Sequence, residues 1–159
     1  MSNPKEPVLL IQGVLAERFF DELKKRSTDQ VFLMEGRPTL EAATRGCRQL
    51  LKRRITPTLI SDNMAGVLFY KNLVKEVWMA YQDTDQEGAV CDSGALILGV
   101  LAKRHVIPVK LFPAQRKTSF LGRPEQLLCF QGTRLAPKGI KAYVPLVEWV
   151  PGKYISEIH

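Results

Sequence analysis

The sequence predicts an α/β fold, a Rossmann-like three-layer sandwich built on a mostly parallel sheet of about six strands. Short apolar runs alternate with segments of helical periodicity along the whole chain. Helices of this length between strands favour right-handed crossovers, which make neighbouring strands parallel. The 159 residues fit a single domain, and we expect one Rossmann-type unit over residues 1–159.

The individual elements follow from the apolar runs and the turn residues between them. Expected strands are Val8–Gln12, Val31–Met34, Pro57–Ile60, Val77–Ala80 and Ile107–Phe112, with Lys141–Val144 as a possible sixth. Expected helices cover residues 15–26, 39–54, 61–73 and 95–104, with Ser61 or Asp62 as the N-cap of the third. Between the fourth strand and the last helix we expect a loop that carries Asp83, Asp85, Glu87 and Asp92.

Composition excludes several classes of protein. The net charge of +7 is compatible with nucleic acid, anionic metabolites or simple solubility, and decides nothing alone. Three cysteines without a C-x-x-C pair favour reduced thiols, and no segment approaches the roughly 20 apolar residues of a membrane span, so a cytoplasmic protein is expected. The acidic loop lacks EF-hand spacing and no phosphate-binding glycine motif occurs, so neither a metal nor a cofactor is expected.

Polar side chains that follow the strands are the candidate site, because ligands of open parallel sheets bind beyond the carboxyl ends of the strands. The candidates at these ends are Gln12, Gly13, Arg37, Asp62, Asn63, Gln82 and Asp83. Asp62 and Asn63 could orient a ligand hydroxyl, hold the neighbouring loops or cap a helix. Arg37 could clamp a phosphate or pair with the acidic loop. A basic stripe of Arg45, Arg48 and Lys52 has no interleaved aromatic residue, which argues against a nucleic-acid surface.

Several motifs resemble those of one protein family. They are EGRPTLEAATRG, ISDNMAG, VLAKRHVIPV and GTRLAPKGIKAYVPLVEWVPGKYISEI, in this order along the chain. Together they resemble the methylthioribose-1-phosphate isomerase family, which includes regulatory subunits of translation initiation factor 2B. The resemblance implies a Rossmann-like domain that usually dimerises, and a helical N-terminal domain that we expect to be absent here.

The resemblance also implies where isomerase chemistry would lie. In the isomerases a cysteine after the first strand and an aspartate after the fourth act as the acid–base pair. The corresponding positions here are about Gln12-Gly13 and Gln82, which cannot transfer protons in this way. A phosphate-contacting asparagine–lysine pair corresponds to Asp92 and Ser93, and a sugar-contacting glutamine to Glu41.

These departures predict a non-catalytic or degenerate family member, with a regulatory role and a homodimeric state. It would bind a small anionic ligand, either a sugar phosphate or a nucleotide, or a protein partner. Arg37 with Arg116, Lys117 and Arg123 could supply positive charge to such a ligand. One alternative is a sugar-phosphate isomerase with a relocated acid–base pair on Asp83 or Asp62, with Cys91 nearby. Another is an interaction protein of the translation machinery or of RNA.

Overall fold

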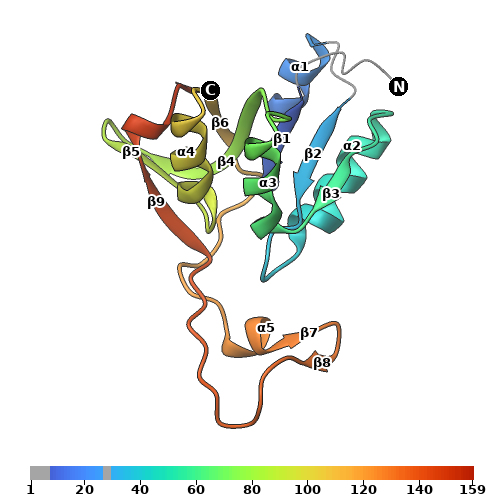
Figure 1. Ribbon diagram of the computed structural model, residues 1–159, viewed down its shortest axis with the longest axis vertical. Coiled ribbons are helices and arrows are strands. Elements are labelled where there is room, and N and C mark those ends of the chain that lie inside the picture. Colours follow the sequence, from blue (N-terminus) through green and yellow to red (C-terminus); the bar gives the residue numbers. More distant parts are fainter. Residues whose placement is uncertain (1–7, 27–29) are drawn as a thin grey trace.

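The computed structural model describes residues 8–26 and 30–159 and confirms the mostly parallel α/β sheet (Figure 1). Its main path runs in the order β10-β6-β4-β1-β2-β3, and all of these strands are parallel. Their bounds are β1 Leu9–Gln12, β2 Val31–Met34, β3 Thr58–Ile60, β4 Glu76–Thr84, β6 Val109–Pro113 and β10 Glu157–Ile158. β5 (Gly88–Asp92) pairs antiparallel with β4, and β9 (Val147–Pro151) pairs antiparallel with β5.

Helices cover both faces of this sheet and create two separate cores. α1 (Arg18–Lys24), the π-helical turn η1 (Ala42–Gly46) and α2 (Cys47–Lys52) cover one face. The 3₁₀ turn η2 (Asp62–Met64), α3 (Ala65–Tyr70) and α4 (Ala95–Arg104) cover the other, and the 3₁₀ turn η3 (Gly152–Tyr154) packs on α4. Because side chains alternate along a strand, Val77 and Met79 of β4 enter one core while Trp78 and Ala80 enter the other.

The expected acidic loop is wrong, because β4 and β5 form a β-hairpin there. β4 continues past Ala80 to Thr84, with a register shift between Tyr81 and Asp83. Asp85 accepts hydrogen bonds from the backbone N–H groups of Glu87 and Gly88 and so makes the tight turn. With β5 and β9 beside the main path, the sheet in the described residues has eight strands rather than about six.

The sixth strand was also placed wrongly. Residues 141–144 are irregular, and the strand lies six residues later, in β9. The apolar run of β9 was masked in the sequence by Glu148, Trp149 and flanking prolines. The third helical segment begins with η2, and Ser61 is its N-cap residue as predicted, but the Ser61 side chain makes no capping hydrogen bond.

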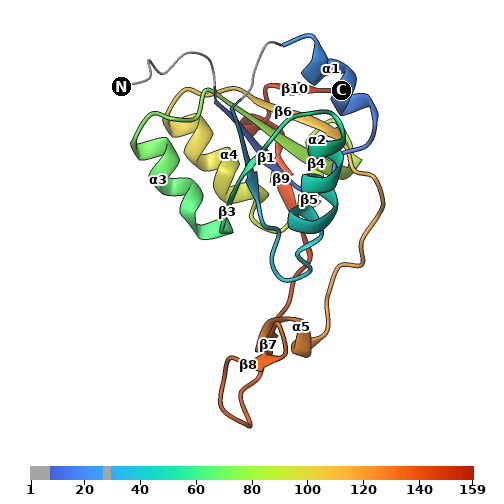
Figure 2. The same ribbon diagram turned by 90° about the vertical axis from the view of Figure 1, so that its right-hand side faces the viewer.

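A long excursion separates β6 from β9 and leaves the three-layer body (Figures 1 and 2). We call residues 119–143 the arm. It contains α5 (Pro124–Leu128), β7 (Cys129–Phe130) and β8 (Thr133–Arg134). Backbone hydrogen bonds from Gly122 to Val144 and from Leu146 to Phe120 join its two ends, and both views show it projecting from the body.

Candidate functional site

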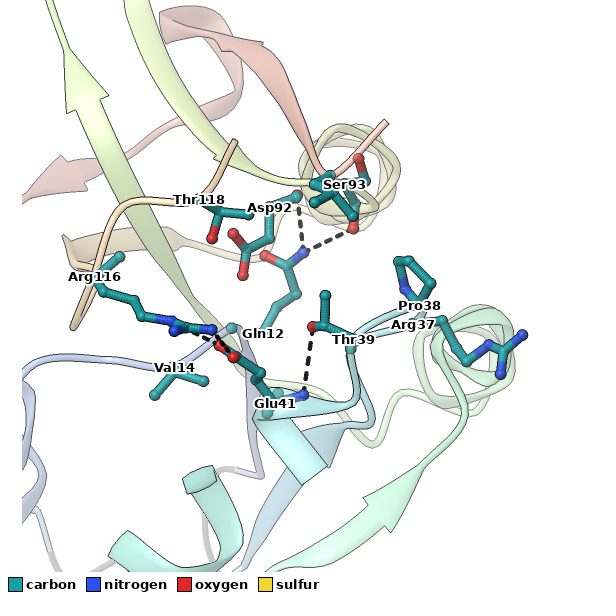
Figure 3. Close-up of a pocket in the computed structure, with 15 residues that line it drawn as sticks. Gln12, Val14, Arg37, Pro38, Thr39, Glu41, Asp92, Ser93, Arg116 and Thr118 are labelled. Atoms are coloured by element: carbon teal, nitrogen blue, oxygen red, sulfur yellow. Dashed lines mark hydrogen bonds and ion pairs between the residues drawn. The ribbon is translucent and has the colours of Figure 1, made fainter. Parts of the chain in front are cut away.

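A small pocket lies at the carboxyl ends of β1 and β2, where the sequence placed the site (Figure 3). Its volume is about 50 Å³. The lining residues come from the ends of β1, β2, β5 and β6 and from the segments that follow them: Gln12, Gly13, Val14, Gly36, Arg37, Pro38, Thr39, Glu41, Ala42, Asp92, Ser93, Ala114, Arg116, Thr118 and Leu146. Such a position is typical of ligand sites in open α/β sheets.

Gln12 and Asp92 form the floor of the pocket, and Gln82, a predicted site residue, supports Asp92 from outside the lining. Gln12 is 3% exposed and donates from Nε2 to the backbone carbonyls of Asp92 (3.0 Å) and Ser93 (3.2 Å). Gln82 donates from Nε2 to the Asp92 carboxylate at 3.0 Å and accepts from the Thr118 N–H at 2.6 Å. Gln82 therefore lies behind Asp92 and ties the hairpin to the segment after β6.

The Asp92 carboxyl is in an unfavourable place for a negative charge. Burial raises the pKa of Asp92, and the hydrogen bond from Gln82 offsets this only in part. Gly13 makes room for the carboxyl: its φ is +88°, and a Cβ there would meet Ala80 Cβ at 2.7 Å and Asp92 Oδ2 at 3.1 Å. The glycine is thus required by both backbone conformation and space.

One atom of the floor has no partner within the described residues. Gln12 Oε1 is buried and accepts no hydrogen bond from any of them. An unpaired buried acceptor costs roughly 1–3 kcal/mol. This cost marks Gln12 as a position where a ligand or solvent donor would be favourable.

An ion pair crosses the pocket on the side of α2. Arg116 binds the Glu41 carboxylate with both Nε, at 3.1 Å, and Nη2 (Figure 3). Two-point pairing of this kind fixes both side chains. Glu41 therefore neutralises Arg116, one of the two arginines that line the pocket.

The other arginine turns its charge away from the pocket. The Arg37 guanidinium lies over the Phe130 ring of the arm, 4.5 Å from its centroid, and Figure 3 shows its side chain pointing outward. The pairing of Arg37 with the acidic hairpin is therefore wrong. Lys117 and Arg123 are absent from the lining, so Arg116 is the basic side chain best placed for an anion.

Asp62 supports the loop that carries Arg37. Its carboxylate accepts hydrogen bonds from the backbone N–H groups of Gly36 (2.9 Å) and Arg37 (2.7 Å). Of the roles considered from the sequence, holding the neighbouring loop is the one that this geometry shows. Asn63 is exposed and bonds to Ser61, outside the pocket lining.

Asp83 also lies outside the pocket. It is exposed on the hairpin, and its carboxylate accepts the N–H of Thr84 at 2.9 Å. Cys91 is fully buried in the core on the α4 side, and burial raises the pKa of its thiol to about 12. Neither side chain has the position or the ionisation that proton transfer in the pocket requires.

Sequence reasoning missed two contributors to the site. Thr118 lines the pocket and bonds to Gln82, although it lies in a segment that showed no pattern. Glu148 of β9 accepts hydrogen bonds at Oε1 from Gly94 N (2.7 Å) and Leu96 N (2.9 Å) and so caps α4. Correct placement of β9 would have put Glu148 opposite Cys91, close to that helix end.

Other kinds of site have no candidate in the described part of the chain. Across residues 8–26 and 30–159, no group of three His, Cys, Asp or Glu side chains could hold a metal ion. The same part of the chain has no helix long and apolar enough to cross a membrane.

The fold and the pocket define an open α/β domain with a ligand-type pocket at the carboxyl edge of its sheet. Residues 11–158 match the Initiation factor 2 subunit family, so the chain belongs to this family, as the motif resemblance indicated. A methylthioribose-1-phosphate isomerase of Syntrophus aciditrophicus is 33% identical over 141 residues, which are 81% of this chain and 38% of that protein. An enzyme of the same name from Thermus thermophilus is 31% identical over 142 residues, covering 80% and 42%. The chain thus spans about two fifths of these relatives' length.

Solved structures show the same fold. Subunit delta of translation initiation factor eIF-2B from A. fulgidus superposes with a TM-score of 0.83 at 21% identity, over 96% of this chain and 51% of that one. The 5-methylthioribose 1-phosphate isomerase of Pyrococcus horikoshii OT3 gives a TM-score of 0.81 at 21% identity, over 96% and 49%. Because each superposition covers 96% of this chain, it includes most of the arm as well as the body.

Proposed function

We propose that this protein is a non-catalytic member of its family that acts by binding a small ligand in the pocket and a second protein subunit through the arm. The observation that supports this most directly is the chemistry of the pocket floor. The positions that the resemblance assigns to the isomerase acid–base pair hold the amides of Gln12 and Gln82, and both amides are engaged in hydrogen bonds. An amide is neither an acid nor a base near neutral pH, so these side chains can position groups but cannot relay protons.

The residues that the sequence suggested for the isomerase alternative are not placed for proton transfer. Asp62 is engaged by two backbone N–H groups, Asp83 faces solvent and the Cys91 thiol is buried. Asp92 is the carboxyl that an isomerase mechanism could still use, because it lines the pocket and its pKa is raised. The second carboxyl of the lining, Glu41, is bound to Arg116, which leaves Asp92 without the second group that proton transfer from two sides of a substrate requires.

The ligand would be of the size of a sugar or sugar phosphate. A cavity of about 50 Å³ holds a few water molecules, so a ligand of this size requires the Glu41–Arg116 pair to part. Parting this pair would expose the Glu41 carboxyl together with Arg116, so the ligand would meet one cation and the two carboxyl groups of Glu41 and Asp92. A cytoplasmic location stays a prediction.

Turnover of methylthioribose 1-phosphate tests the non-catalytic part of the proposal. We expect no isomerisation by the full chain at any pH between 5 and 9 (about the range in which a carboxyl acid–base pair would work). The double variant Gln12→Cys, Gln82→Asp is the matched comparison, because it restores the residue types of the isomerase pair at the same positions. Turnover by the unmodified chain that Asp92→Asn abolishes would refute the proposal and establish the enzyme.

The arm supports the proposed second subunit. None of its residues is buried, and it exposes six large apolar side chains: Phe120, Leu121, Leu127, Leu135, Ile140 and Tyr143. A five-residue helix and two-residue strands cannot hold such a segment by themselves. The arm is about as long as the roughly 20–30 residues that each partner contributes to a standard interface.

A second copy of this chain is the partner that the surface favours. Val67 and Tyr70 of α3 and Ile97 and Val100 of α4 are also exposed, on the body's helical layer. In a twofold dimer each copy would offer both an arm and a receiving surface of this kind. Six apolar groups that stay in water are otherwise an aggregation liability.

Sedimentation equilibrium of the purified chain tests this part. We expect a dimer, and we expect the variant Phe120→Ser, Tyr143→Ser to weaken association by at least about 100-fold, as the loss of two buried aromatic anchors does. Leu51→Ser is the control, because Leu51 is 55% exposed on α2, on the opposite face of the sheet. A monomeric chain, or equal effects of both variants, would contradict the arm as the association surface. A steep fall of RNA binding with salt concentration would instead favour the nucleic-acid alternative.

A further inference from the structure

We propose that the pocket selects an uncharged, hydroxyl-bearing ligand, such as a sugar without phosphate, which donates a hydrogen bond to Gln12 Oε1 and lies against the Asp92 carboxyl. This inference rests on the proposed function, because it presumes that the pocket binds a small ligand. It specifies the ligand's chemical class and departs from the phosphate-bearing ligand expected from the resemblance.

The orientation of the Gln12 amide is fixed by its neighbours. Both contacts of the nitrogen, the carbonyl oxygens of Asp92 and Ser93, are acceptors, so the opposite orientation would place Gln12 Oε1 against two other oxygens. Both N–H groups of the amide are thereby used. Oε1 is left as a buried acceptor without a partner in the described residues, on a side chain that lines the pocket. A bound group must therefore offer a donor at this point.

The charges around this acceptor disfavour phosphate. Asp92 and Glu41 both line the pocket, and Glu41 already neutralises Arg116. Arg37 is turned toward Phe130. Even with the Glu41–Arg116 pair parted, a phosphate would meet two carboxyl groups and one arginine, which is an unfavourable arrangement for a dianion.

The helix end beside the pocket is also closed to anions. The first N–H groups of a helix commonly bind phosphate. At α4 the carboxylate of Glu148 takes this position and accepts from Gly94 N and Leu96 N. A phosphate at the same helix end would have to displace this carboxylate.

Hydroxyl groups match the remaining lining well. A hydroxyl both donates and accepts, so it can satisfy Gln12 Oε1 and the Asp92 carboxyl in either protonation state. The side chains of Thr39 and Thr118 add two further hydroxyls at the pocket, as Figure 3 shows. The combination of two acceptors and two threonines is a surface for a polyol.

Calorimetric titration of the full chain with ribose, ribose 5-phosphate and inorganic phosphate tests the inference. We expect ribose to bind at least about tenfold more tightly than ribose 5-phosphate, as charge repulsion of modest size predicts. Gln12→Met, which removes the acceptor from a side chain of similar length, is expected to weaken ribose binding about tenfold or more. Asp83→Asn is the matched control: it removes an exposed carboxylate outside the pocket and should leave both affinities unchanged.

A second variant keeps the test valid if Gln12→Met folds poorly. Asp92→Asn with Ser93→Lys restores the asparagine–lysine pair of the resemblance and is expected to reverse the preference in favour of ribose 5-phosphate. Tighter binding of ribose 5-phosphate than of ribose by the unmodified chain would overturn this inference and leave the proposed ligand function intact. Binding of none of the three probes would mean that the pocket holds water only, and would overturn the ligand part of the proposed function as well.

Discussion

The body and the arm of this protein differ in how their side chains are covered. In the body, β4 buries Val77, Trp78, Met79 and Ala80 in succession, with exposed fractions of 0–1%. In the arm, Phe120 is 74% exposed and Tyr143 77% exposed, and no residue is buried. The body therefore has its own hydrophobic core, whereas the arm has none. Apolar surface of this extent on a small protein usually marks an interface.

The body and the arm also differ in how clearly the sequence indicates their structure. Burial on both faces of a parallel sheet produces runs of consecutive apolar residues, and such runs located five of the strands. The arm has aromatic and aliphatic residues too, but they are spaced among glycine, proline and basic residues without a period. A segment that packs on another molecule need not follow the periodicity of its own elements.

The largest effect on the free energy of unfolding is expected in the aromatic core of the body. Phe112 is fully buried, and its ring centroid lies 4.6 Å from that of Trp78 and 4.4 Å from that of His159. Phe112→Ala should lower the free energy of unfolding by about 3–5 kcal/mol, because it leaves a cavity. Urea unfolding at a concentration where the chain is monomeric measures this.

Tyr143→Ala is the matched change in the arm. It should alter the free energy of unfolding of the monomer by less than about 0.5 kcal/mol, since an exposed ring loses little contact. A loss in Tyr143→Ala comparable to that in Phe112→Ala would show that the arm packs on its own body, and would remove the contrast between the two regions.

Prediction of the fold from the sequence succeeded for elements whose own residues carry a local apolar pattern. The strands β1, β2 and β3 and the helices over residues 65–70 and 95–104 lie within predicted ranges, β4 and β6 overlap theirs, and β10 was not predicted. The hairpin of β4 and β5 was missed because its polar residues face solvent at the edge of the core, which a search for apolar runs interprets as a loop. Register shifts such as that between Tyr81 and Asp83 depend on pairing with β5, and no local pattern encodes them.

Prediction of the pocket was limited in a different way. The rule that ligands lie beyond the carboxyl ends of strands identified Gln12, Gly13 and Arg37 as neighbours, and all three line the pocket. It also named Asp62, Asn63, Gln82 and Asp83, which do not. The rule gives positions of backbone, not directions of side chains. It therefore could not show that Arg37 turns to Phe130, or that Glu41 finds its partner in Arg116, 75 residues away.

A smaller effect on stability is expected from substitution of Asp92 at the floor of the pocket. Burial raises the native pKa of Asp92 above its usual value of 3.8, so the native state holds its proton more tightly than the unfolded state does. Stability is therefore unaffected by this group below about pH 3.8 and decreases as pH rises through the raised native pKa. Asp92→Asn removes the charge and keeps an acceptor for Gln82. It should raise the melting temperature at pH 7 by about 2–4 °C, for a gain of about 1 kcal/mol.

The pH dependence distinguishes this effect from a general one. The difference between Asp92→Asn and the unmodified protein should vanish well below pH 3.8, where Asp92 is protonated in both folded and unfolded chains. Asp83→Asn, which removes an exposed carboxylate, should show no such difference at any pH. A stabilisation of equal size in both variants would mean that net charge, rather than burial of Asp92, causes it.

The smallest effect on stability is expected from removal of most of the arm. Gly122 N and Val144 O are 2.8 Å apart, so residues 123–143 can be replaced by an Asn-Gly turn that joins the two ends. The body's two cores contain no residue from the deleted segment, and a shorter connection costs less entropy to close. The free energy of unfolding of the monomer should therefore stay within about 0.5 kcal/mol, while sedimentation should show the loss of the dimer. A body that unfolds without the arm would mean that the arm stabilises its own subunit, and the exposed aromatic residues would then need another explanation than a partner.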